Sequence, residues 1–147
     1  MSAQAAAQGV EIAVIRFTAT TATAADAARQ IGCTIAEIVK SLVFHADGRA
    51  VLILCSGADR VDGSKLAAVL GATVVRRATA DEAKAATGSA IGGVPPFGHV
   101  TDLRVIVDDG LMAFTTVWAA AGLPDAVFPI APGDLVRVSR GTVADVT

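Results

Sequence analysis

The chain has 147 residues, of which 53% are hydrophobic and 18% charged, so it can form one domain with a core of ordinary size. A formal net charge of −2 argues against a protein that grips long nucleic acid by charge alone, although it is compatible with binding a small anionic group or an RNA end. Its two cysteines, Cys33 and Cys55, have neither the number nor the spacing of a disulfide framework or a zinc site, a pattern typical of a reducing compartment.

The N-terminal residues, MSAQAAAQGVEIAV, have neither the basic start nor the long apolar core of a signal peptide. No later run of 18 apolar residues could span a bilayer, so we expect a cytoplasmic protein without a membrane partner. Residues 10–17 are β-branched and roughly alternating, which predicts a first strand. An Ala-rich helix follows, with a capping signal at Thr23 and Asp26 and an end at Gly32.

The middle of the chain predicts a hairpin and a helix. Asp47-Gly48 separates the apolar runs SLVFHA and AVLILC, and Asp-Gly readily adopts the positive φ angles of a two-residue hairpin turn. Residues 62–70 place their apolar side chains on one helical face, and Gly71 is the predicted end of this helix.

The second half predicts further strands and helices. The strand TVVRRA precedes a helix that begins after Thr79 and ends near Gly88. LRVIVDDGLMAFTTVW indicates a second hairpin about Asp109-Gly110, and a short strand near VFPI precedes a helix over residues 132–139. Strands and helices mix without βαβ alternation, so we expect an α+β fold of one domain, residues 1–147, with a single mixed sheet, curled and flanked by helices.

Lys40 is unusual because it stands at the start of an apolar strand. Strand alternation places it on one face with Leu42 and Phe44, and Ser41 on the other face. An ammonium group on an apolar face either extends to water at the end of the sheet or points into a pocket where it meets an anion. Taken alone, the residue pattern favours the interpretation in which the ammonium extends to water.

The segment GGVPPFGH, residues 92–99, is a loop of unusual stiffness. Its glycines permit positive φ or close approach, whereas its two prolines fix φ and remove two N–H donors. The few remaining main-chain groups would be held in fixed directions, which suits a polar ligand. The alternative is a structural crossover or a cis-proline turn, which composition alone favours slightly. Neither metal-ligand spacing nor a Ser-His-Asp set is apparent in the chain, and we expect no metal and no cofactor.

Together with Lys40 and this loop, the order of four segments resembles the YbaK family of aminoacyl-tRNA editing domains, also called prolyl-tRNA synthetase-associated domains. The resemblance covers nearly the whole chain. It implies a sheet rolled into a barrel-like shape with helices outside, and hydrolysis of the ester that joins a wrong amino acid to a tRNA. The segments are EIVKSLVF (37–44), KLAAVLGA (65–72), TGSAIGGVPPFG (87–98) and AGLPDAVFPIAPGDL (121–135).

The resemblance also implies roles for individual residues. The family's lysine, which is needed for activity and is held to place the terminal nucleotide, corresponds to Lys40. The first glycine of the family's GxxxP loop, whose main chain places the ester and a water, corresponds to Gly92. Lys40 and Gly92 are therefore the catalytic candidates, and Lys40 is reinterpreted as functional. The substrate-binding candidates are Thr23, Gly93, Val94, Pro95, Pro96, Phe97, Gly98, Ala120, Gly122 and Val127.

Three of these positions bear on the substrate. By alignment with cysteine-specific members, Thr23, Ala120 and Val127 correspond to pocket positions that are aromatic, hydroxyl-bearing and acidic there. They are small or apolar here, which argues against a dedicated cysteine pocket. We therefore expect a trans-editing deacylase for tRNA mischarged with a small amino acid of the Ala, Ser, Thr or Cys class. An aminoacyl ester is reactive enough for positioning and oxyanion stabilisation to supply most of the acceleration.

The expected partners are the acceptor end of an aminoacyl-tRNA, with an aminoacyl-tRNA synthetase or a second copy in a homodimer as further candidates. Two alternatives stay open. One is a non-catalytic module that binds aminoacyl or nucleotide ligands and acts with a synthetase, and the other is a structural oligomer without a ligand. The modest charge predicts few phosphate contacts and therefore a shallow salt dependence of RNA binding.

Overall fold

A computed structural model describes residues 9–17, 23–123 and 125–147. The described strands form two sheets, one with five strands in the order β4-β2-β3-β5-β8 and one with three in the order β1-β7-β6. The predicted mixture of strands and helices is confirmed, but the prediction of a single sheet is wrong. The barrel-like closure expected from the resemblance is not found among the described strands.

The five-stranded sheet is mixed. Its centre is the hairpin of β2 and β3, whose turn residues Asp47 and Gly48 have φ angles of 50° and 82°, as the sequence predicted. β4 pairs antiparallel with β2, whereas β5 pairs parallel with β3, and β8 parallel with β5. The strands are β2 (Val39–Ala46), β3 (Arg49–Ser56), β4 (Val75–Arg77), β5 (Arg104–Asp108) and β8 (Thr142–Ala144).

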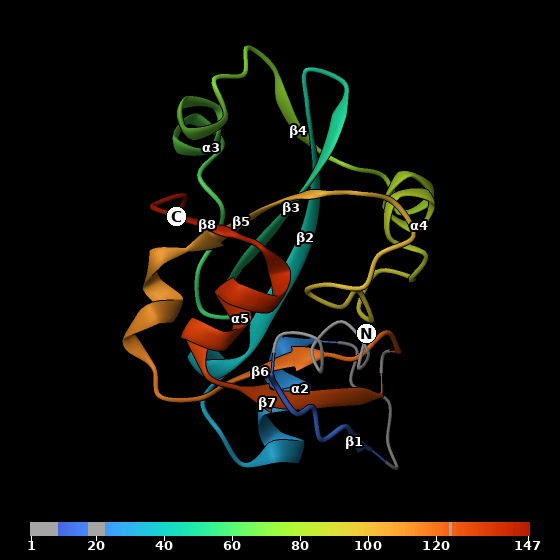
Figure 1. Cartoon of the computed structure of the whole chain (residues 1–147), viewed down its shortest axis with the longest axis vertical. Coiled ribbons are helices and arrows are strands. Elements are labelled where there is room, and N and C mark those ends of the chain that lie inside the picture. Colours follow the sequence, from blue (N-terminus) through green and yellow to red (C-terminus); the bar gives the residue numbers. More distant parts are fainter. Residues whose placement is uncertain (1–8, 18–22, 124) are drawn as a thin grey trace.

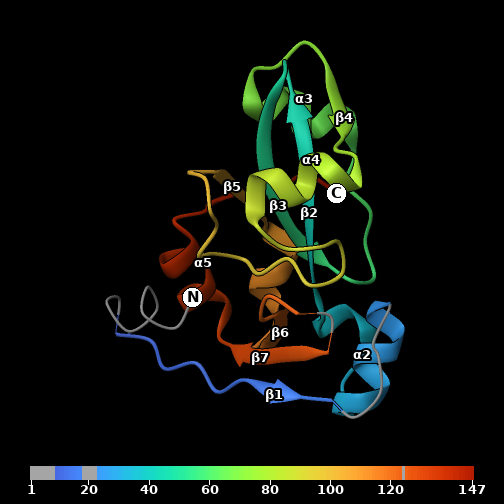
Figure 2. The same ribbon diagram turned by 90° about the vertical axis from the view of Figure 1, so that its right-hand side faces the viewer.

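The three-stranded sheet is antiparallel and consists of β1 (Ile15–Arg16), β6 (Val117–Ala120) and β7 (Ala126–Ile130). The first strand is shorter than predicted, because only its last part pairs with β7. Within the described ranges, a bridge between Ile38 and Trp118 joins this sheet to the residue that precedes β2. Figure 1 shows the long β2–β3 hairpin rising from the three-stranded sheet, with α3 and α4 on opposite sides of it, an arrangement that Figure 2 repeats from the side.

The helices begin and end close to the predicted residues. Thr23 Oγ1 accepts the Asp26 N–H at 3.1 Å, and Gly32, Gly71 and Gly88 end their helices in the left-handed conformation. None of the helices within the described ranges has the length and apolar character needed to cross a membrane. The helices are α2 (Ala24–Ile31), α3 (Gly63–Leu70), α4 (Ala80–Thr87) and α5 (Pro132–Ser139), with 3₁₀ turns η1 (Ile35–Glu37) and η2 (Asp109–Ala113).

The second predicted hairpin is wrong. After β5 the chain enters η2, and β6 then joins the other sheet instead of pairing with β5. The fully buried Asp108 explains the difference, because its carboxylate accepts hydrogen bonds at 3.1 Å from the Gly110 and Val146 N–H groups and from the Thr147 hydroxyl. The carboxylate therefore holds residues 109–110 against the C-terminal segment and not in a two-residue turn.

The two faces of β2 pack into different parts of the core. Val39 and Val43 belong to the larger hydrophobic cluster, which also contains Phe97 and Phe128. Leu42 and Phe44 contact the smaller cluster beneath α3. The alternation predicted from the sequence is therefore correct, and it places the Lys40 side chain on the α3 face and the Ser41 side chain on the opposite face.

Candidate functional site

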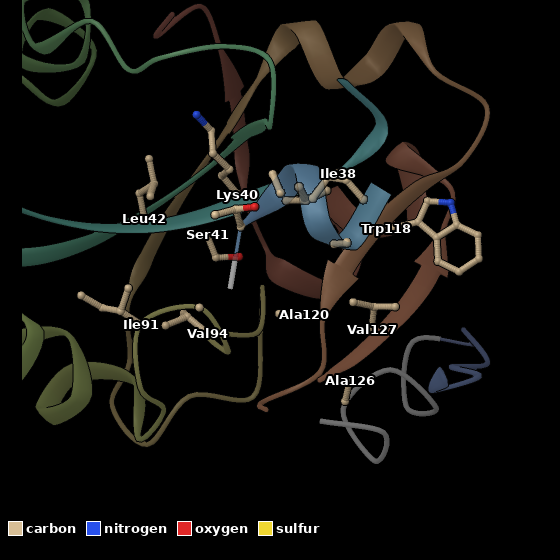
Figure 3. Close-up of a pocket in the computed structure, with 15 residues that line it drawn as sticks. Ile38, Lys40, Ser41, Leu42, Ile91, Val94, Trp118, Ala120, Ala126 and Val127 are labelled. Carbon is tan, nitrogen blue, oxygen red and sulfur yellow. The ribbon is translucent and has the colours of Figure 1, made fainter. Parts of the chain in front are cut away.

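A cavity of about 230 Å³ lies where the two sheets meet. Its walls come from four parts of the chain. These are the start of α2, the bridge residue Ile38 with the first residues of β2 (39–42), the loop at residues 91–94, and the strands β6 and β7. The lining is largely apolar, and small side chains on α2 and β6 leave the space open. Figure 3 shows these side chains converging from segments far apart in the sequence.

Half of the site residues predicted from the sequence meet at this cavity. The two catalytic candidates, Lys40 and Gly92, both line it, although 52 positions of sequence numbering separate them. The substrate-binding candidates that line the cavity are Thr23, Val94, Ala120 and Val127.

The other candidates do not line this cavity. Phe97 is 1% exposed and packs edge-on against Phe128, with ring centroids 5.9 Å apart. Phe97 and Gly98 instead border a separate hollow of about 440 Å³. Phe97 therefore anchors the loop in the hydrophobic core. The candidates away from the cavity are Gly93, Pro95, Pro96, Phe97, Gly98 and Gly122.

The loop at the cavity is fixed by its own main chain. The Gly93 N–H donates to the Ala90 carbonyl at 3.0 Å and closes a turn in which Gly92 has a φ of 95°. The described peptide bonds are all trans, so the loop is not a cis-proline turn. Behind it, His99 Nε2 lies 2.6 Å from the Pro95 carbonyl oxygen, and burial lowers the pKa of the imidazole. A neutral ring whose Nε2–H donates to this carbonyl fits both observations.

Lys40 reaches the site from one side of β2. Its stem lines the cavity, while its ammonium group donates a hydrogen bond to the Asp59 carbonyl. Figure 3 shows the amino end directed away from Ile91 and Val94, in agreement with its place on the α3 face. Among the described residues no carboxylate forms an ion pair with Lys40. An ammonium has three donors, so two are left for an anionic group that arrives at the cavity from this side.

Ser41 is a cavity residue that the sequence reasoning missed. It lines the cavity from the strand face opposite Lys40, and its Oγ is buried without a hydrogen-bond partner among the described residues. The available signal was its position as a hydroxyl between Val39 and Val43 on an apolar strand face. Strand alternation alone did not reveal which neighbouring elements would leave this hydroxyl unpaired. Trp118 is half-buried and also lines the cavity.

The described lining of the cavity offers the hydroxyls of Thr23 and Ser41 but no acidic or imidazole side chain that could activate them as nucleophiles. Among its described lining residues there is no Asp, Glu, His or Cys. Cys55, which pairs with Lys40 across the hairpin, is fully buried, and burial raises the pKa of its thiol to about 11. Such a thiol stays protonated near neutral pH and is a poor nucleophile. The arrangement therefore suits chemistry in which a reactive substrate and a water are positioned, rather than covalent catalysis.

One group of carboxylates is close enough to share a metal ion, but it lies outside this cavity. Ligand atoms of Asp108, Asp109 and Asp145 lie within 4.8 Å of one another. Asp108 already accepts three hydrogen bonds, and Asp145 pairs with Lys65 at 3.0 Å. Contacts within the chain therefore account for this cluster.

Comparison with known proteins gives consistent matches. One relative is the uncharacterised protein YwhH of Bacillus subtilis, which is 34% identical over 131 residues, 88% of this chain and 83% of the relative. The proline–tRNA ligase of Geobacillus kaustophilus is 37% identical over 93 residues. That match covers 63% of this chain but only 16% of the ligase, so the similarity concerns one part of the synthetase.

A solved structure has the same fold along the entire chain. It was determined for a protein described as a candidate trans-editing enzyme for prolyl-tRNA synthetase, and it superposes with a TM-score of 0.88 at 39% identity, covering 100% of this chain and 98% of that one. A family model described as the aminoacyl-tRNA editing domain matches residues 18–138, which include both β2 and the Gly92 turn. The chain belongs to the aminoacyl-tRNA editing domain family.

Proposed function

We propose that the protein is a trans-editing aminoacyl-tRNA deacylase that hydrolyses the ester of a tRNA mischarged with a small amino acid of the Ala, Ser, Thr or Cys class. The observation that carries the proposal is that Lys40 and Gly92 line one small, apolar cavity in a chain of the editing family. The proposed partner is the acceptor end of the tRNA, in the cytoplasm. The similarity to prolyl-tRNA synthetases favours a synthetase as a second partner.

The size of the cavity supports a substrate that carries a small acyl group. Sites that enclose a whole drug-sized ligand occupy about 300 to 1,000 Å³. A cavity of about 230 Å³ fits the amino acid, while the nucleotide stays at the mouth, where Lys40 can meet its phosphate. Discrimination between apolar side chains by size amounts to only about 1 to 3 kcal/mol per methylene. We therefore propose that several small amino acids are released, at graded rates.

The proposed mechanism relies on the positioning of the ester and of a water molecule. The turn at Gly92 holds the ester beside a water, and main-chain N–H groups stabilise the negative charge that develops on the ester oxygen. Attack of the water on the carbonyl carbon breaks the bond to the ribose oxygen and releases the free amino acid and the intact tRNA. The bound geometry takes the place of an activated nucleophile, for which the described lining of the cavity has no carboxylate, imidazole or thiol.

The test uses tRNAs mischarged with Ala, Ser, Thr or Cys and measures release of amino acid over the spontaneous rate. We expect release of at least one of them, and a loss of about 100-fold or more in Lys40→Ala with an unchanged circular dichroism spectrum. The matched control is Lys65→Ala, because Lys65 is exposed and pairs with Asp145 away from the cavity. Absence of release from all four tRNAs would contradict the deacylase and favour a binding module that acts with a synthetase.

A further inference from the structure

The edge of β2 that faces the cavity has an opening between two neighbouring strands. β6 reaches this edge at Ile38, through the bridge to Trp118. β4 reaches it from Val43 onward, because the Ala78 N–H donates to the Val43 carbonyl at 3.0 Å. Between these two contacts, the described part of the chain places no strand against residues 39–42. The same residues line the cavity, so the opening in the sheet edge forms one wall of the cavity.

The main-chain groups at this opening have a defined direction. Along an antiparallel strand the N–H and C=O of successive residues point alternately to one edge and to the other. The Val43 carbonyl faces β4, on the cavity edge, whereas the Ile38 carbonyl accepts the Gly57 N–H at 2.7 Å on the β3 side. The carbonyls of Val39 and Ser41 therefore face the cavity edge, and so does the Ser41 N–H.

A further acceptor belongs to the same residue as one of these carbonyls. Ser41 Oγ is buried, has no hydrogen-bond partner within the described ranges and lies on the strand face that lines the cavity. Buried hydroxyl groups are normally hydrogen-bonded, so an unpaired one at a cavity indicates a place for a polar group of a ligand. Ser41 thus offers both its hydroxyl and its carbonyl at the cavity edge, whereas the Val39 carbonyl lies two residues, about 6.6 Å, further along the strand.

The two acceptors of Ser41, in a cavity wall without a described carboxylate, match one group of the proposed substrate. An aminoacyl ester carries a free α-ammonium with three N–H donors, and no Asp or Glu is found among the described residues that line the cavity to neutralise it. We propose that the carbonyl and the hydroxyl of Ser41 bind this ammonium, so that Ser41 is a positioning residue which restricts the site to esters with a free amino group. The inference rests on the proposed deacylase function and specifies which part of the substrate the strand edge recognises.

The first experiment measures binding, so that it is independent of hydrolysis. Two stable amide analogues are compared by calorimetry with the full chain: 3′-alanylamido-3′-deoxyadenosine and its lactyl counterpart, in which a hydroxyl of similar size replaces the ammonium. We expect the lactyl compound to bind at least tenfold more weakly. Equal affinity for the two compounds, or no binding of either, would overturn the inference. Binding with this preference but without hydrolysis of any mischarged tRNA would instead overturn only the deacylase.

Substitution of Ser41 separates positioning from a structural role. In Ser41→Ala we expect weaker binding of the alanyl analogue, by about five- to tenfold, with little change for the lactyl analogue, so that the preference shrinks. Ser41→Thr keeps a hydroxyl in a strand position that favours β-branched residues, and should retain most of the preference. The control is Ser64→Ala, at an exposed position of α3. A loss in Ser41→Ala that is equal for both analogues would show a merely structural role and contradict the proposal.

Discussion

At position 92 the main chain has a φ of 95°, and an added Cβ would meet no atom within 4 Å. The space is open, so the cost of a side chain there comes from the backbone conformation and not from a clash. In Gly92→Ala we expect the turn at residues 90–93 to change shape. The free energy of unfolding should fall by about 1 to 2 kcal/mol, and deacylation should fall at least tenfold.

Urea unfolding and the mischarged-tRNA assay measure these two effects separately. The control is Gly63→Ala, because Gly63 has no positive φ and also has no neighbour within 4 Å. It begins α3, where alanine should leave stability and activity essentially unchanged or raise stability slightly. A Gly92→Ala variant that retained full activity would contradict the role given to the turn.

The residues at the cavity differ in how far the sequence could predict them. Lys40 and Gly92 were assigned by resemblance, and the structure places both of them in the lining of one cavity. Ser41 was not found, because its importance depends on the absence of a partner on neighbouring elements. The direction of the Lys40 ammonium was also not predictable, since it depends on the Asp59 carbonyl in a separate connection.

At the scale of the elements, α4 is joined to β4 through one carboxylate. The Glu82 carboxylate accepts hydrogen bonds from the Thr79 N–H and from both terminal guanidinium nitrogens of Arg76, each at 2.8 Å. The Arg76 guanidinium, followed by the Thr79 N–H, holds the pKa of Glu82 well below its ordinary value of 4.5. A carboxyl with a depressed folded pKa contributes stability above its unfolded pKa, and this contribution is lost as the pH falls below about 4.5.

Glu82→Gln removes this pH-dependent contribution. We expect the variant to be less stable than the wild type at pH 7, and the difference between the two proteins to shrink between pH 5 and pH 2. Urea unfolding across this range measures the effect. The other described carboxyls with lowered pKa values, such as Asp47 and Asp125, are present in both proteins and cancel in the comparison. A difference that stays constant with pH would contradict the assignment.

The loop behind the cavity is held by Phe97, which is buried against Phe128. Truncation of a buried phenylalanine leaves a cavity and costs about 3 to 5 kcal/mol, so we expect this loss in Phe97→Ala. The matched control is Val100→Ala in the same loop, where the side chain is 71% exposed and the expected change is within about 0.5 kcal/mol. Similar unfolding free energies for the two variants would show that Phe97 does not anchor the loop.

The elements that the sequence predicted well are those with local signals. The capped helices and the Asp47-Gly48 hairpin depend on residues within a few positions of one another. The second hairpin was predicted wrongly because Asp108 bonds to Val146 and Thr147, which are remote in sequence. A turn motif cannot reveal that its carboxylate is used elsewhere in the fold.

At the scale of the whole molecule, the cavity exists because the strands form two sheets instead of one. The bridge between Ile38 and Trp118 brings the sheets together at one end of β2, and β4 covers its other end. Sequence patterns predict strands but not which edges pair, because pairing depends on contacts across long stretches of chain.

The central claim is that the acylated end of an RNA occupies the cavity between the edge of β2 and the turn at Gly92. The most direct test is NMR titration of the labelled protein with 3′-alanylamido-3′-deoxyadenosine. We expect the largest shifts in backbone amide signals at Ser41, Gly92 and Ala120. Shifts concentrated instead around the separate hollow bordered by His99 and Arg140, with the signals of Ser41 and Gly92 unmoved, would contradict it.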